Sequence, residues 1–183
     1  MAEITEKIMD YMSTTHVNHP LLLDKLSEFL AVERGGKMLY QAALSLVHDP
    51  DVLRQFQKFY EQTVRHEEIL TRVISQLGGS PAHISEGARL AETKAHALLE
   101  SMNRTDGMRP AQVELNAMEN IVLAETKDHA DWELLGKIAR QSSDERIRDV
   151  LKAVVGDVEA EEDEHLNWTK TKMAELSMAA LSR

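Results

Sequence analysis

The chain has 183 residues, no cysteine and a formal net charge of −10. Its length suits one domain with a sizeable core, and few glycines and prolines beside abundant Ala, Leu, Met and Glu are typical of an all-helical protein. The acidic balance argues against binding to nucleic acid or to an anionic membrane, and the lack of cysteine excludes disulfides and thiolate ligands. No apolar run approaches the roughly 18 residues that a membrane span needs. We therefore expect a cytoplasmic protein with no nucleic-acid and no membrane partner.

The first half of the chain predicts a helical hairpin. The first 18 residues suggest a short leading helix. A long helix then starts at Pro20 and ends before Asp49-Pro50. Proline is favourable in the first turn of a helix, whereas a proline further along the chain ends the helix. A second helix over residues 51–77 stops at Gly78-Gly79. Residues 83–105 are weakly amphipathic and predict a partly helical crossover.

The second half predicts another hairpin after a loop over residues 106–110. Its helices cover roughly residues 111–140 and residues 144–176, the latter capped by Ser142 or Ser143; residues 177–183 are expected to fray. The fold class is therefore all-α: a four-helix bundle of two helical hairpins joined by a long, partly helical crossover. We expect one domain over residues 1–183, with the core bundle at about 20–176.

The two hairpins form a weak internal repeat. "LAVERGGKMLY" aligns with "VLAETKDHADW" at an offset of 92 residues, which pairs Glu33 with Glu125 and Tyr40 with Trp132. The second and fourth helices align at an offset of 99, which pairs His66 with His165. Acid and aromatic residue are seven positions apart, about two turns, so they share a helix face. The aromatic pair is expected to fill the core, with contact to the acids as the alternative.

The apolar stripes of all four long helices carry acids or histidines near their midpoints. Burying an unpaired carboxylate costs several kcal/mol, so such residues need partners. Carboxylate together with neutral imidazole suits iron, manganese or zinc rather than calcium. The sequence thus predicts a metal centre in the middle of the bundle. Its candidate ligands are Glu33, His66, Glu67, Glu125, Asp128, Glu162 and His165.

This pattern resembles the ferritin-like superfamily over about residues 20–176, with rubrerythrins, manganese catalases and small ferritin-like stress-response proteins as the nearest types. That superfamily has a lone Glu on the first and third helices, as at Glu33 and Glu125, and Glu-x-x-His on the second and fourth, as at Glu162 and His165. Asp128 resembles an extra acid of rubrerythrins. The resemblance implies two iron or manganese ions (zinc being possible), a small oxidant such as oxygen or peroxide, and a homodimer. It also implies a ferroxidase-, peroxidase- or catalase-like role, or iron handling in oxidative stress.

The second helix departs from the family pattern. His66 matches the histidine, but Thr63 occupies the glutamate position, where a hydroxyl replaces a bridging carboxylate poorly. Glu67, Glu61, the carbonyl of Gln62 or Asp128 could compensate. Thr63 also favours the alternative function: a non-enzymatic helical bundle, a stress-associated structural or interaction protein with a partial or absent metal site.

Two adjacent glycines, Gly35 and Gly36, follow Glu33 within the first long helix. Together they weaken a helix by about 2 kcal/mol relative to alanine. We expect them to leave room for a close neighbouring helix, a bulge or an entering small molecule beside the metals. Tolerated drift is the alternative.

Overall fold

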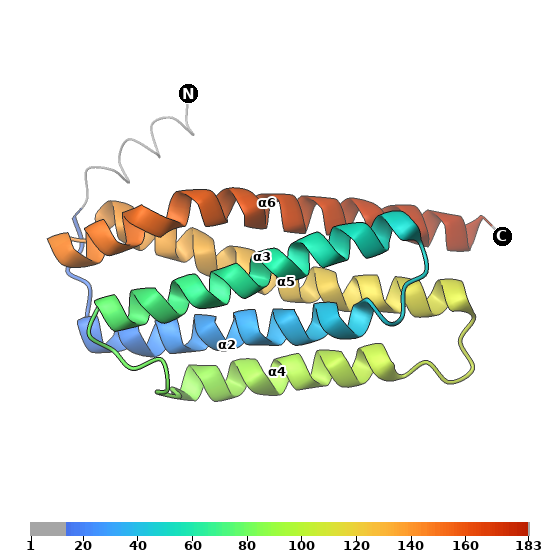
Figure 1. Cartoon of the computed structure of the whole chain (residues 1–183), viewed down its shortest axis with the longest axis horizontal. Helices are drawn as coiled ribbons and strands as arrows, with labels where there is room; N and C mark the ends of the chain where they lie inside the picture. Colours follow the sequence, from blue (N-terminus) through green and yellow to red (C-terminus); the bar gives the residue numbers. More distant parts are fainter. Residues whose placement is uncertain (1–13, 183) are drawn as a thin grey trace, which may run out of the picture.

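The computed structural model describes residues 14–182, which contain five helices and no β-strand (Figure 1). The helices are α2 (His19–Ala43), α3 (Pro50–Gln76), α4 (Glu86–Asn103), α5 (Pro110–Gln141) and α6 (Glu145–Leu181). The predicted all-α class is therefore confirmed.

Local capping sets the helix starts. The Asn18 side chain accepts a hydrogen bond from the backbone N–H of Leu21 at the start of α2, and Asp49 accepts one from Asp51 at the start of α3. A proline stands in the first turn of each, where its missing N–H leaves no bond unmade. The prediction that Ser142 or Ser143 caps the last helix is wrong, because the cap is Asp144, whose Oδ1 accepts from the Ile147 N–H at 3.1 Å.

Some predicted boundaries also differ from the structure. Helix α2 ends at Ala43, and residues 44–46 form a turn before the Asp49 cap. Helix α6 continues to Leu181 instead of fraying after residue 176, since Met, Ala and Leu favour helix and no breaker interrupts them. Of the predicted leading helix, residues 1–13 lie outside the described part of the chain, and residues 14–18 are not helical.

The helices form a bundle of two antiparallel hairpins, α2 with α3 and α5 with α6 (Figure 1). The hairpins meet through α2 against α5 and α3 against α6. The crossover contains a full helix, α4, which runs along the outside of the bundle and packs on α2 and α5.

The apolar core is divided in two along the bundle. One cluster includes Phe29, Leu70 and Trp132, and the other includes Tyr40, Phe59 and Ile121. In every long helix, buried polar residues lie between the two clusters. The bundle therefore has a polar layer near its middle, with apolar packing on either side.

Gly35 permits the close approach of α4 to α2. A Cβ atom at this position would lie 2.7 Å from the Cβ of Ala95 on α4, a distance too short for two carbon atoms. Gly35 is thus explained by a neighbouring helix, one of the expected reasons for the glycine pair.

We predict that Gly35→Ala destabilises the fold although alanine is the better helix former. Overpacking against Ala95 costs about 1–3 kcal/mol, which exceeds the gain of up to about 1 kcal/mol in helix propensity. Urea unfolding should therefore give a lower free energy of unfolding than wild type. Gly156→Ala in α6 is the matched control, because a Cβ there meets nothing within 4 Å; it should stabilise the protein. Equal stabilisation by both changes would contradict the close contact.

Candidate metal centre

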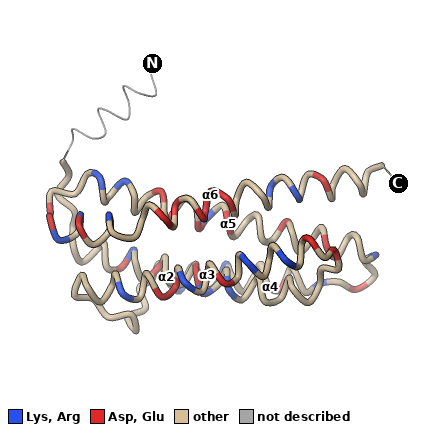
Figure 2. The backbone as a smooth tube through the Cα atoms, turned by 45° about the horizontal axis from the view of Figure 1, so that its top comes forward, with Lys and Arg blue, Asp and Glu red and all other residues tan. Residues whose placement is uncertain are grey.

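Six side chains of the types that commonly bind metals, four carboxylates and two imidazoles, are buried together in the polar layer. Figure 2 shows acidic residues near the middle of α5 and α6, where this layer lies. None of the six is more than 5% exposed. They are Glu33 from α2, His66 from α3, Glu125 and Asp128 from α5, and Glu162 and His165 from α6.

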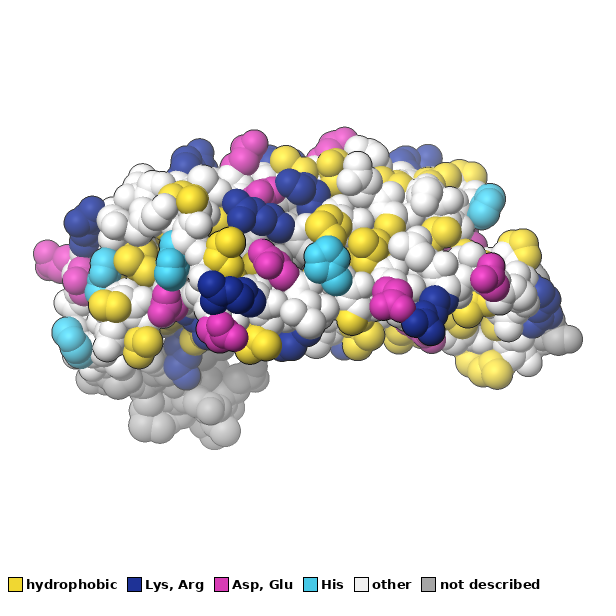
Figure 3. Space-filling model, turned by 90° about the horizontal axis from the view of Figure 1, so that it is seen from below, with side chains coloured by type: hydrophobic (Ala, Val, Ile, Leu, Met, Phe, Trp, Pro, Cys, Tyr) yellow, Lys and Arg dark blue, Asp and Glu magenta, His cyan; other side chains and the backbone are white. Residues whose placement is uncertain are grey.

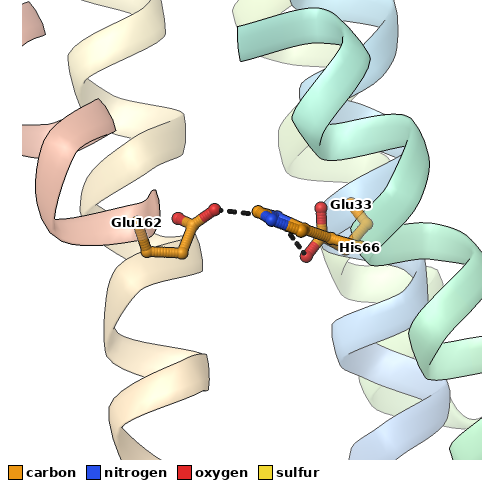
Figure 4. A group of neighbouring side chains, drawn as sticks. All are labelled: Glu33, His66 and Glu162. Atoms are coloured by element: carbon orange, nitrogen blue, oxygen red, sulfur yellow. Dashed lines mark ion pairs between the residues drawn. The ribbon is translucent and has the colours of Figure 1, made fainter. Parts of the chain in front are cut away.

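Two groups of three residues in this cluster could hold a metal ion. Glu33, His66 and Glu162 form the first group, and Glu125, Glu162 and His165 form the second; within each group the ligand atoms lie within 4.8 Å of one another. Figure 4 shows the His66 ring directed toward the Glu162 carboxylate, with an ion pair to Glu33 as well. Because Glu162 belongs to both groups, its carboxylate lies between the two candidate positions.

The histidine nitrogens lie close to the carboxylates. The Nδ1 atom of His66 is 3.1 Å from Glu162 Oε1 and 3.7 Å from Glu33 Oε1. The Nδ1 atom of His165 is 3.3 Å from the same Glu162 oxygen and 3.2 Å from Glu125 Oε2. Neither nitrogen makes a hydrogen bond despite these distances. The two histidine nitrogens and the carboxylate oxygens thus lie close together, but they lack the geometry of hydrogen bonds to one another.

The inward-facing atoms of the cluster lack hydrogen-bond partners. In the described chain, all the buried side-chain nitrogen and oxygen atoms without a partner belong to this cluster. A buried polar atom without a hydrogen bond costs about 1–3 kcal/mol, and the ion pairs of the two histidines with Glu162 and Glu125 offset only part of this cost. A divalent cation would satisfy these atoms. They are Glu33 Oε2, His66 Nδ1, Glu125 Oε2, Asp128 Oδ1, both oxygens of Glu162 and His165 Nδ1.

Aromatic residues hold the outer oxygens of the first and third helix acids. The Tyr40 hydroxyl donates to Glu125 Oε1, and the Trp132 indole N–H donates to Glu33 Oε1, both at 2.7 Å. Each bond crosses from one hairpin to the other. Tyr40 and Trp132 therefore fill the core and also contact the acids, so both of the expected roles apply.

The outer nitrogens of the histidines are held in a matching way. His66 Nε2 lies 2.8 Å from Glu161 Oε2, and His165 Nε2 lies 3.1 Å from Gln62 Oε1. Such bonds fix the ring orientation, and metal-binding histidines commonly have a partner of this kind. Sequence reasoning missed Glu161, and it considered Gln62 only as a ligand. The offset of 99 residues that relates the two histidines also relates Gln62 to Glu161, and it could have identified the pair.

Two of the residues that were considered as replacements for the missing α3 glutamate, Glu67 and Glu61, point away from the cluster, and so does the Thr63 hydroxyl. The carboxylate of Glu67 is paired with Arg34 at 2.9 Å and with Lys37, outside the cluster. Glu61 accepts a hydrogen bond from Gln57 on the α3 surface. The Thr63 hydroxyl donates to the Phe59 carbonyl at 3.0 Å, so it makes a bond within its own helix. Asp128 is one of the six buried side chains of the cluster but belongs to neither group of three.

Burial and crowding change the acidity of the cluster. Burial and the nearby charge of Glu162 hold the pKa of Glu33 well above its usual range, and burial and Glu33 do the same to the pKa of Asp128. Burial opposes ionisation of Glu162 as well, but its contacts with His165 and His66 lower its pKa to about 2. Burial opposes protonation of His165, yet Glu125 and Glu162 raise the pKa of His165 to about 10. Excess negative charge is thus the main electrostatic feature of the site.

Comparison of the chain with protein-family models, with curated proteins and with solved structures found no match. No helix in the described residues is long and apolar enough to cross a membrane. The functional argument therefore depends on the chemistry of the site.

We predict that Tyr40→Phe destabilises the protein by about 1–3 kcal/mol, because it leaves the buried Glu125 Oε1 without its donor. Chemical denaturation of the metal-free protein measures the change. Tyr60→Phe removes an equal hydroxyl from a half-buried tyrosine that packs on the same apolar cluster, and it should have a smaller effect. Equal effects of the two substitutions would contradict the role given to Tyr40.

Asp131, one turn beyond Asp128, gives a pH-dependent prediction. Burial raises its pKa from 3.8 to about 6, although its ion pair with Lys127 acts in the opposite direction. The folded state therefore binds this proton more tightly than the unfolded state, and stability falls as the pH rises from about 4 to about 6. A shift of this size corresponds to about 3 kcal/mol. Asp131→Asn should thus be more stable than wild type at pH 7, with the difference shrinking below pH 4. Thermal unfolding across this pH range tests this, and a difference that does not change with pH would contradict it.

Proposed function

We propose that this protein is a ferritin-like dimetal carboxylate protein that uses iron or manganese for oxygen or peroxide chemistry, or for iron handling in oxidative stress. The observation that carries the proposal is the set of buried, unpartnered carboxylate and imidazole atoms facing one another in the middle of the bundle. Ligands of this type suit iron, manganese or zinc.

The two candidate groups assign a role to each residue. His66 and Glu33 would bind one metal, and His165 and Glu125 the other. Glu162 would bridge the two, because it belongs to both groups. Neutral imidazole is the ligating form of histidine, so metal binding would release the proton that the apoprotein holds on His165.

The bundle compensates only in part for the absent glutamate at Thr63. In the internal repeat, Thr63 is the counterpart of Glu162, and Gly36 is the counterpart of Asp128. The hairpin of α5 and α6 therefore has two carboxylates at positions where the hairpin of α2 and α3 has none. Thr63 and Asp128 both lie beside Gly36: a Cβ at this position would be 3.5 Å from Thr63 Cγ2 and 4.0 Å from Asp128 Oδ2. Asp128 is therefore the carboxylate best placed to serve the Thr63 side.

Bound iron or manganese would supply one-electron redox chemistry toward dioxygen or peroxide. The chain would supply the rest of the site. Tyr40 and Trp132 keep Glu125 and Glu33 in place, and the apolar clusters on either side exclude bulk water. A fixed ligand set in a dry cavity is what a two-metal centre requires of its protein.

The second candidate is a non-enzymatic bundle with a partial or absent metal site. The bond from Thr63 to the Phe59 carbonyl favours it, because this hydroxyl is already used within α3. Metal content separates the two functions. A dimetal protein should bind about two ions per chain, whereas a structural bundle would bind one weakly or none.

The expected partners follow from the same proposal. A small oxidant, oxygen or peroxide, is the proposed reactant, and a homodimer is the proposed assembly. The net charge of −10 disfavours nucleic acid as a partner.

We predict that Glu162→Gln abolishes binding at both metal positions, because it removes the shared carboxylate. Elemental analysis after anaerobic loading with ferrous iron or manganese measures this. Glu164→Gln is the matched control, since it makes the same change two residues away on an exposed side chain; it should bind metal like wild type. A chelator should also lower the Tm of the wild-type protein, because a ligand at a thousandfold excess over its dissociation constant stabilises by about 4 kcal/mol. Unchanged metal content in Glu162→Gln would contradict the site.

A further inference from the structure

An apolar cavity lies between α2, α4 and α5, beside the candidate metal centre. Its volume is about 170 Å³, similar to that of an engineered cavity of about 150 Å³ that binds benzene or xenon. Figure 3 views the molecule from the side that carries α4, where hydrophobic side chains are exposed among charged ones. The cavity lining is mostly aliphatic and includes Val32, Leu39, Ala91, Leu98 and Ala124.

Gly36 forms the boundary between this cavity and the metal centre. The glycine lines the cavity. Its missing side chain would point at Thr63 and Asp128, with no contact to either closer than 3.5 Å. Asp128 is only 5% exposed, and its Oδ1 has no hydrogen-bond partner. At Gly36 there is thus no side chain to fill the space between the cavity and this buried carboxylate.

The boundary lies on the side of the centre that has fewer ligands. Glu162 supplies a carboxylate between the two positions, but its repeat partner Thr63 directs its hydroxyl to the Phe59 carbonyl. The Thr63 methyl group is the atom that a side chain at position 36 would meet first. A small molecule that passed Gly36 would therefore arrive beside Thr63, where α3 offers no carboxylate to the metal.

We infer that this cavity is the entry path for dioxygen, and this inference rests on the proposed function. Dioxygen has no hydrogen bonds to lose on entering an aliphatic cavity, whereas hydrogen peroxide would lose several. The charged lining residues do not change this: Lys127 is paired with Glu28 at 3.3 Å, and Lys94 is exposed to solvent. The substrate class of the centre is therefore a small apolar oxidant.

The first test uses xenon and the metal-free protein, so its result does not depend on metal binding. Xenon dissolved under pressure should shift the backbone amide NMR signals of Gly36 and Ala91, and a crystal pressurised with xenon should show the atom in the cavity. Ala91→Leu, which fills the cavity from α4, should abolish both signals. A protein that takes up no xenon in this cavity would overturn the inference, even if the centre binds two metals.

The second test places a methyl group at the boundary. Gly36→Ala should fold normally, because its Cβ contacts of 3.5 and 4.0 Å are ordinary van der Waals distances. With both ferrous ions bound, oxidation by dioxygen in stopped flow should slow by about tenfold. Oxidation by hydrogen peroxide should keep its wild-type rate. Gly156→Ala makes the same change in α6, away from the cavity, and should alter neither rate.

These outcomes separate the entry path from the metal proposal. Wild-type metal content with slow dioxygen oxidation supports both. Wild-type dioxygen kinetics in Gly36→Ala would overturn the entry path while leaving the centre intact, and equal slowing of both oxidants would overturn the assignment to dioxygen. Failure to bind metal would refute the proposed function, and the xenon test would still decide whether the cavity admits an apolar gas.

Discussion

The arrangement of the bundle depends on one constraint: a layer of carboxylates and imidazoles has to be buried between two apolar clusters. Such a layer is tolerated only if each polar atom has a partner. The chain meets this requirement for the outward-facing atoms, through Tyr40, Trp132, Gln62 and Glu161. It leaves the inward-facing atoms without hydrogen-bond partners. A core selected for stability alone would avoid this pattern, because apolar residues of similar size are often at least as stable. The unpaired atoms are therefore the strongest indication of a ligand.

The near-symmetry of the site makes its two exceptions informative. Acids, histidines, aromatic residues and the partners of the histidines all recur between the hairpins, whereas Thr63 and Gly36 stand opposite Glu162 and Asp128. Both exceptions are small residues that lie next to each other, and Gly36 lines the α4 cavity. If the two carboxylates had been lost by independent neutral substitutions, there would be no reason for Thr63 and Gly36 to lie next to each other. The position of α4 follows the same pattern, since Gly35 lets it approach α2 at this level.

The sequence predicted those features that depend on local chemistry. Prolines and the Gly78-Gly79 pair marked helix ends, and acids on apolar stripes marked the buried layer. The features that were missed depend on the rotation of side chains about the helices. Glu67 is adjacent to His66, but a rotation of about 100° per residue turns it toward Arg34 and Lys37. A close neighbouring helix was one of the reasons expected for Gly35, but its contact residue could not be predicted, because nothing in the crossover segment specifies that Ala95 lies against α2. The pairing of Gln62 with Glu161 follows from the same offset of 99 residues that relates the two histidines, so the repeat contains this information.

The crossed aromatic bonds also have a consequence for assembly. Glu33 is held by a tryptophan of the opposite hairpin, and Glu125 by a tyrosine of the opposite hairpin, so neither hairpin contains a complete half of the centre. Sliding one hairpin along the other by a single helical turn, about 5.4 Å, would break both bonds and leave two buried carboxylates without donors. Apolar clusters alone tolerate such a slip more easily, since one aliphatic contact can replace another. The two bonds therefore define the register in which the hairpins dock, and with it the alignment of all four helices.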